Sequence, residues 1–243
     1  MADTLAVPVQ PRSVEAGRGI AWWTEAWALF VKNAGMWIVL ALVFLVIFIV
    51  LSVIPLLGSI AASLLTPVLV GGWMLAARKV EAGGKLEVGD LFAGFQDKLT
   101  PLLVLGALLL AASLVIFFAV GALGFGAVMG LAMGSSQQSA GGVMAALGAG
   151  FAALVVGLVL GSLVAMAFWF APALVVFRNM APVDAAKASF AANLKNLLAF
   201  LVFGAVYLVA AIVASIPFGL GWIVLIPVSL LAVYVSSKDV FGV

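Results

Sequence analysis

Apolar residues form six long runs along this chain, separated by shorter polar segments. The runs lie at residues 36–56, 59–77, 100–123, 150–177, 197–216 and 220–235. Most are close to the roughly 20 residues that cross a bilayer as a helix. Lipid offers no partner to backbone N–H and C=O groups, and the runs lack the two-residue alternation of a membrane barrel. The pattern therefore predicts an all-α membrane protein with six transmembrane helices.

Short amphipathic segments precede the first, third and fifth runs. Each places a phenylalanine (Phe30, Phe92 or Phe190) seven residues before an apolar residue near the start of the run, and these apolar residues are Trp37, Leu99 and Leu197. We expect each segment to form a short cytoplasmic helix. Together they indicate a threefold repeat of one short helix and two spans, over residues 18–78, 88–178 and 182–238. Generic similarity among membrane helices is the alternative explanation.

The first of these segments, residues 18–34, is the most clearly amphipathic. At 100° per residue, Arg18, Glu25 and Lys32 share one face. The opposite face carries Ile20, Trp23, Trp27, Phe30, Val31 and Ala34. Tryptophan favours the headgroup zone, so we expect this helix to lie in the plane of the inner leaflet, with packing against the other cytoplasmic helices as the alternative. The candidate membrane-interface residues are Trp22, Trp23, Trp27, Phe30, Phe92 and Phe190.

The positions of the basic residues predict the orientation of the chain. With six spans, all 11 lysines and arginines fall on the same side as the N-terminus. The positive-inside rule then places both termini in the cytoplasm. Residues 1–17 lack the apolar core of a signal peptide and are expected to form a disordered cytoplasmic tail. Residues 18–238 are expected to form a single transmembrane domain, followed by a cytoplasmic tail over residues 239–243.

The middle of the chain carries no charge between residues 99 and 177. Its strongly polar residues cluster at 135–139, which predicts a helical hairpin whose arms are longer than a bilayer requires. Glycines four residues apart on these arms favour close packing of helix backbones. The candidate packing residues, for a homo-oligomer interface or for contacts within one chain, are Gly126, Gly130, Gly134, Gly157 and Gly161.

Composition supports the membrane assignment and narrows the chemistry. Hydrophobic residues make up 67% of the chain and charged residues 8%, against about 45–50% and 25% in soluble domains. Cysteine and histidine are absent, which excludes disulfides, thiolate chemistry and the commonest metal ligand. The net charge of +2 is interpreted as a topology signal, and no nucleic-acid partner is expected.

The six runs contain no Asp, Glu, Lys, Arg, His, Asn or Gln, which disfavours proton relays and ion-coupled transport. A serine nucleophile would need a base, and no phosphate-binding loop motif is present. We therefore expect no enzyme activity, no catalytic residue, no cofactor and no metal site. Pro67, Pro172 and Pro227 interrupt the even-numbered spans, as in the broken helices of some transporters, although proline is also common in membrane helices.

Several local motifs resemble those of one family. They are Trp22-Trp23 with residues 26–30, then residues 89–95, then residues 170–175, and finally residues 234–239. In this order they resemble proteobacterial inner-membrane proteins described only as transmembrane proteins of unknown function. A fainter likeness links them to the membrane portion of some glycerophosphodiester phosphodiesterases, whose catalytic domain has no counterpart here. The resemblance implies a multi-pass protein of the bacterial inner membrane and assigns no functional residues.

Two functions are consistent with these patterns. The first is a non-enzymatic organiser of lipid or protein partners at the inner leaflet, suggested by the one-sided charges and the tryptophan-rich helix. The second is a facilitator, or permease-like protein, for a small apolar or lipid-like substrate, which would use the proline-containing even spans. The expected partners are membrane lipids, with other proteins or a second copy of the chain as further candidates.

Overall fold

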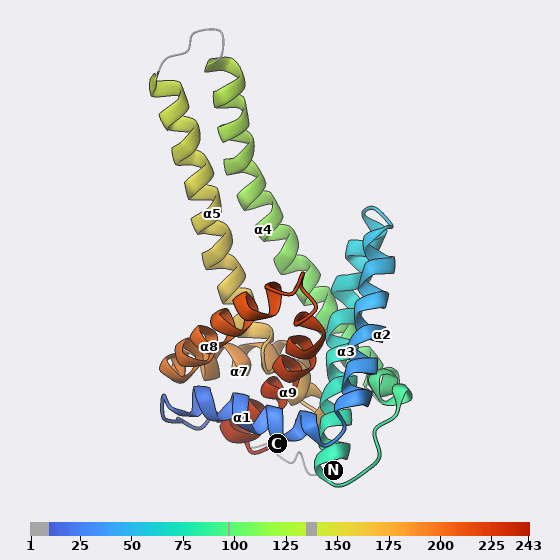
Figure 1. Cartoon of the computed structure of the whole chain (residues 1–243). Coiled ribbons are helices and arrows are strands. Elements are labelled where there is room, and N and C mark those ends of the chain that lie inside the picture. The colour runs from blue at the N-terminus through green and yellow to red at the C-terminus, as the bar shows by residue number, and fades with distance from the viewer. Residues whose placement is uncertain (1–9, 97, 135–139) are drawn as a thin grey trace, which may run out of the picture. The chain divides into compact units, whose positions relative to one another are not determined.

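The computed structural model describes residues 10–96, 98–134 and 140–243, without the side chains of 130–140, and the regular secondary structure of this part is all helical (Figure 1). The all-α prediction is therefore confirmed. The elements are α1 (Arg18–Val31), α2 (Ala34–Ser52), α3 (Leu57–Glu81), the 3-10 helix η1 (Val88–Phe95), α4 (Leu99–Gly134), α5 (Ala140–Phe168), α6 (Ala171–Arg178), α7 (Pro182–Lys195), α8 (Leu197–Ser215) and α9 (Trp222–Phe241).

Six helical segments of the described chain are long and apolar enough to cross a membrane, as the sequence predicts. They are Ala34–Ser52, Leu57–Glu81, Leu99–Met129, Gly141–Arg178, Leu197–Ser215 and Trp222–Phe241. The short helices α1, η1 and α7 precede the first, third and fifth of them. The order of one short helix and two spans thus occurs three times, and common ancestry of the three units stays a prediction.

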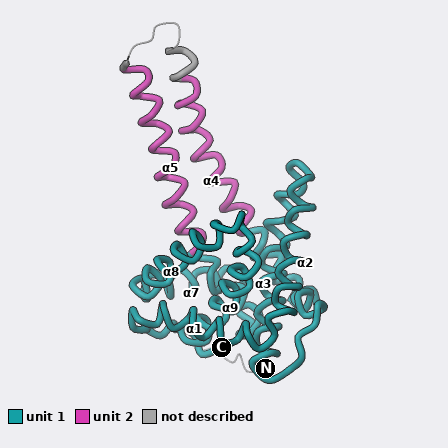
Figure 2. Tube along the Cα trace, viewed as in Figure 1, with its two compact units in different colours: residues 1–107, 166–243 teal, residues 108–165 magenta. Residues whose placement is uncertain are grey.

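The chain folds into two compact units (Figure 2). The first contains residues 1–107 and 166–243, and the second contains residues 108–165. The single domain expected over residues 18–238 therefore comprises two compact units. The second unit consists of parts of α4 and α5, and the polar cluster at 135–139 lies outside the described residues.

Within the first unit, α3 and α9 are the interior helices. In the most apolar stretch of α3, 50% of the residues are buried, and in that of α9 56% are buried. The buried share is only 17% in the corresponding stretches of α2 and α8. Small residues on α3 allow neighbours to approach its backbone. A side chain at Gly72, for example, would overlap the carbonyl of Leu91 in η1. Each of the two hairpins α2–α3 and α8–α9 therefore has one helix inside the unit and one largely exposed.

The 3-10 helix η1 is fixed to the end of α3 by charge as well as by close packing. Lys79 donates to both carboxylate oxygens of Asp90, at 2.9 and 3.0 Å. Asp90 also accepts from the backbone N–H of Glu87 at 2.8 Å, which closes a capping box at the start of η1. The second short helix is thus attached to the end of the hairpin that precedes it.

The fourth span is broken between α5 and α6. The helix ends at Phe168 and resumes at Ala171, with Pro172 in its first turn. The carbonyl of Met166 accepts from Ser189 Oγ at 2.7 Å and from Asn193 Nδ2 at 3.0 Å, both on α7. Two side chains of α7 therefore donate to a backbone carbonyl that the break leaves without a partner in its own helix.

The expectation that three prolines interrupt the even-numbered spans is corrected by the structure. Only Pro172 accompanies a break, because Pro67 lies inside the continuous helix α3 and Pro227 inside the continuous helix α9. A proline removes one N–H and crowds one carbonyl, and neighbouring helices and hydroxyl groups can compensate for this in a membrane helix.

Both ends of the chain differ in detail from the tails expected from the sequence. Residues 10–17 follow a defined path, since Asn196 donates to the carbonyl of Arg12 at 2.9 Å and accepts from the N–H of Val14 at 2.7 Å. Residues 1–9 lie outside the described part. At the other end, α9 continues to Phe241, so most of the tail expected from residue 239 is helical.

Candidate functional site

Helix α1 is held by one face against α8 and α9. Trp22 and Ala26 are fully buried on this face, and Gly19 lies against the backbone of Ala199 in α8. The ring of Trp23 stacks on Phe203 with centroids 4.7 Å apart, and its indole N–H donates to the Phe203 carbonyl at 3.3 Å. The contact is dense and specific, so α1 is an integral part of the first unit.

A second face of α1 is apolar and exposed. Ile20, Trp27 and Val31 are 53%, 51% and 53% exposed, respectively. They are seven and four residues apart, so they form one stripe along the helix, which we call the α1 stripe. An apolar groove of about 390 Å³ lies beside it, between Trp23 and Trp27 of α1 and the α8–α9 hairpin.

The structure divides the interface candidates into buried and exposed groups. Trp22, Trp23 and Phe30 are buried between helices, and the rings of Trp22 and Trp23 pack on the span α8 rather than on the other short helices. Trp27 and Phe92 are exposed, at 51% and 38%, and Phe190 is partly buried on α7. The apolar face expected from the helical wheel is therefore two faces with different neighbours.

The candidate packing glycines lie on α4 and α5. A Cβ at Gly157 would contact Val120 at 3.2 Å, so this glycine faces the partner helix within the second unit. A Cβ at Gly126 or Gly161 would meet no described atom within 4 Å. Gly130 and Gly134 belong to α4, and their surroundings lie outside what the structure describes.

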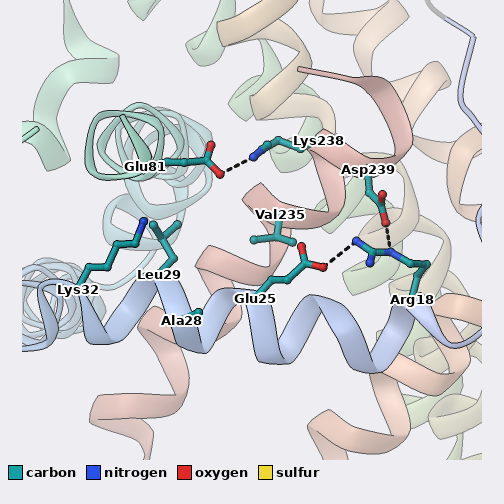
Figure 3. Close-up of a pocket in the computed structure, with 9 residues that line it drawn as sticks. All are labelled: Arg18, Glu25, Ala28, Leu29, Lys32, Glu81, Val235, Lys238 and Asp239. Carbon is teal, nitrogen blue, oxygen red and sulfur yellow. Dashed lines mark hydrogen bonds and ion pairs between the residues drawn. The ribbon is translucent and has the colours of Figure 1, made fainter. Parts of the chain in front are cut away.

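The third face of α1 lines a charged pocket of about 420 Å³ (Figure 3). The pocket lies between α1 and the C-terminal ends of α3 and α9. We call it the charged pocket, and its lining residues are Arg18, Glu25, Ala28, Leu29, Lys32, Glu81, Val235, Lys238 and Asp239. The polar face predicted for residues 18–34 thus meets charged residues that lie far away in the sequence.

Ion pairs connect the walls of the charged pocket. Arg18 contacts Glu25 at 2.9 Å and Asp239 at 2.5 Å, and Asp239 also accepts from the indole N–H of Trp22 at 2.9 Å. The hydrogen bond that Arg18 donates to Asp239 is the largest cause of the raised pKa of the Arg18 guanidinium. This wall joins the beginning of α1 to the end of α9.

The opposite wall is built around Glu81 at the end of α3. Its carboxylate pairs with Lys238 of α9 and accepts from the Tyr234 hydroxyl at 2.7 Å. Figure 3 shows Lys32 of α1 extending toward this wall, beside Leu29. Among the described residues, Lys32 is the one cation of the pocket for which no carboxylate lies within ion-pair distance.

Four serine and threonine hydroxyl groups on the spans bond to their own helices. Ser63, Thr66 and Ser229 each donate to the carbonyl four residues earlier, at 3.0, 2.7 and 2.6 Å, and Ser162 does the same at 2.7 Å. Such bonds are the usual way in which a membrane helix satisfies a hydroxyl group. Hydroxyl groups such as these would be needed to line a polar transport path, and none of the four has a polar partner on another helix in the described part of the chain.

The fold and the one-sided distribution of charge define a helical multi-pass membrane protein. A probable inner membrane protein of Burkholderia thailandensis is 30% identical to this chain over 213 residues, which cover 85% of this chain and 77% of that protein. The chain belongs to this family of bacterial inner-membrane proteins. This relative gives no support for the likeness to glycerophosphodiester phosphodiesterases. No family model and no solved structure matches the chain.

Proposed function

We propose that this inner-membrane protein is a non-enzymatic organiser of lipid or protein partners at the inner leaflet, with both termini in the cytoplasm. The observation that carries the proposal is the three-sided character of α1. One face is packed against α8 and α9, a second bears the exposed α1 stripe, and a third lines the charged pocket. A helix fixed in this way holds an apolar stripe and a charged surface at constant positions.

The α1 stripe has the chemistry of an interfacial anchor. Ile20 and Val31 provide apolar surface, and Trp27 provides a ring that favours the boundary between headgroups and acyl chains. The beginning of α1 pairs with Asp239, and its end lies close to Glu81, so both ends lie beside the charged ends of spans. This supports α1 running along the membrane surface rather than across it.

The orientation is supported by the same charged residues. Arg78 and Lys79 end the second span, Arg178 ends the fourth and Lys238 lies near the end of the sixth. The turn between α8 and α9, where Phe218 is fully exposed, carries no charged residue. Lysine and arginine are retained on the cytoplasmic side during insertion, which favours cytoplasmic termini.

Spin labelling tests the placement of α1, because the chain contains no native cysteine. In lipid nanodiscs, labels at Ile20→Cys and Val31→Cys should collide more with oxygen than with a water-soluble nickel complex. Glu25→Cys, exposed on the polar face of the same helix, is the matched control and should show the reverse. Equal nickel accessibility at all three positions would contradict a membrane-facing stripe.

Thiol labelling of intact cells tests the orientation separately. Phe218→Cys should react with a membrane-impermeant maleimide once the outer membrane is permeabilised, whereas Lys85→Cys and Lys187→Cys should react only after the inner membrane is opened. All three positions are exposed in the structure. Labelling of Lys85→Cys in cells with an intact inner membrane would reverse the proposed orientation.

A further inference from the structure

We propose that the charged pocket binds a phosphoethanolamine group, presented as the headgroup of an inner-leaflet phospholipid. The inference deepens the proposed function and rests on the placement of α1 at that leaflet. It starts from the charge balance of the pocket. Three cations and three carboxylates line it, and they are Arg18, Lys32, Lys238, Glu25, Glu81 and Asp239. A ligand that carries one positive and one negative group preserves this balance.

The negative group of the ligand, its phosphate, binds beside Lys32. Arg18 is shared between Glu25 and Asp239, and Lys238 is paired with Glu81. In the described part of the chain, Lys32 alone among the pocket cations has no carboxylate within ion-pair distance. An ammonium group is a compact donor of three hydrogen bonds and commonly binds phosphate as a point charge. A phosphate at this place would receive a donor that the protein does not otherwise use.

The positive group of the ligand, its primary ammonium, binds beside Glu25. Its carboxylate contacts Arg18 through one oxygen, and its side chain is 46% exposed. The guanidinium it contacts is already bonded to Asp239 at 2.5 Å, so Glu25 provides the more available of the two carboxylates. A primary ammonium would find an acceptor there without displacing the Arg18–Asp239 contact.

The separation of these two residues fits a short zwitterion. Glu25 and Lys32 are seven residues apart on α1, which is about 10 Å along the helix axis. Figure 3 shows both side chains rising from the same side of the helix, with Ala28 and Leu29 between them. One hydrogen bond of about 3 Å at each end leaves a gap that suits a phosphate and an amine joined by two carbons.

The lining residues also separate ethanolamine from other headgroups. Quaternary ammonium groups are recognised by aromatic rings, and none of the nine described residues that line the pocket is aromatic. A glycerol headgroup carries no cation to pair with Glu25. Ala28, Leu29 and Val235 provide an apolar surface beside the charges, which suits the carbon atoms that follow the phosphate in a lipid.

Native mass spectrometry of the delipidated full-length protein in detergent tests the proposal. The probes are dioleoyl phosphatidylethanolamine, phosphatidylcholine and phosphatidylglycerol. The ethanolamine lipid should bind about fivefold more tightly than the other two, the ratio expected when one partly exposed ion pair is gained. Equal retention of the three lipids would overturn the proposal. Free phosphoethanolamine should displace the bound lipid, whereas binding of the free compound without any retention of the lipid would exclude the membrane source.

Two variants assign the contacts. Lys32→Gln should weaken binding of all three lipids alike, by about fivefold, because all three carry the phosphate. Glu25→Gln should weaken the ethanolamine lipid alone. Lys85→Gln, an exposed lysine that does not line the pocket, is the matched control and should leave all three affinities unchanged. Unchanged affinity in Lys32→Gln, with circular dichroism showing a folded protein, would overturn the proposal.

The spin-label result keeps the two ideas separate. An α1 stripe that faces lipid, together with no preference among headgroups, would remove the phosphoethanolamine site and leave the organiser function standing. A headgroup preference together with a stripe that faces water would retain a binding site and remove the lipid-facing role of α1.

Discussion

The helices α1 and α7 occupy equivalent places in the chain and use opposite chemistry. Each has 14 residues and each precedes a hairpin of two spans. Helix α1 buries aromatic residues and glycine and leaves an apolar stripe exposed. Helix α7 buries Ser189 and Asn193, whose side chains hold the broken backbone of the fourth span. Equal position in a repeat therefore does not imply equal function.

The difference follows from what each helix is packed against. Helix α1 lies on two unbroken helices, α8 and α9, and combines close apolar packing with the contacts of Arg18 and Trp22 to Asp239. Helix α7 lies beside the break between α5 and α6, where a free carbonyl needs a donor. An unsatisfied buried carbonyl costs about 1–3 kcal/mol, which is enough to favour asparagine over a larger apolar residue.

The largest effect is expected for Trp22, the fully buried tryptophan of α1. Trp22→Ala should lower the free energy of unfolding by about 3 kcal/mol, since it leaves a cavity and removes the donor to Asp239. Trp27→Ala, on the exposed stripe of the same helix, should change it by about 0.5 kcal/mol or less. Circular dichroism during a titration into SDS measures both. Equal losses would mean that the two rings have equivalent surroundings.

A smaller loss is expected where α1 lies closest to α8. In Gly19→Ala the new methyl group would overlap the Ala199 carbonyl, so α1 must shift, at a cost of about 2 kcal/mol. Gly17→Ala is the matched control, because none of the described neighbouring atoms lies within 4 Å of a Cβ at that position. The same titration should show a change at Gly19 only. A neutral Gly19→Ala would show that the α1–α8 contact is looser than described.

On α7, Asn193→Leu should cost about 1–2 kcal/mol, because the Met166 carbonyl keeps only its bond from Ser189. Lys187→Ala, on the exposed side of α7, is the control and should be neutral. Thermal unfolding in mild detergent, followed by intrinsic fluorescence, compares the two. If Asn193→Leu were as stable as the parent, apolar packing would suffice at α7, and the contrast with α1 would be lost.

Much of the fold could be predicted from the sequence. The six spans and the short helices before the odd ones follow from local apolar content, and the membrane assignment follows from composition. Arg18, Glu25 and Lys32 were placed correctly on one face from their spacing of seven. Their partners could not be predicted, because Glu81, Lys238 and Asp239 lie about 50 to 220 residues away and no local pattern pairs them.

The sequence by itself determined which segments lie in lipid and which lie in water, because transfer into lipid depends on the residues of each segment alone. The tertiary structure decided which side of each helix faces a neighbour. Apolar side chains suit lipid and protein equally, so periodicity could not separate buried Trp23 from exposed Trp27. The tertiary structure also decided that Pro172 accompanies a break in a span whereas Pro67 and Pro227 do not. Helix α7 supplies the donors for the Met166 carbonyl that this break frees.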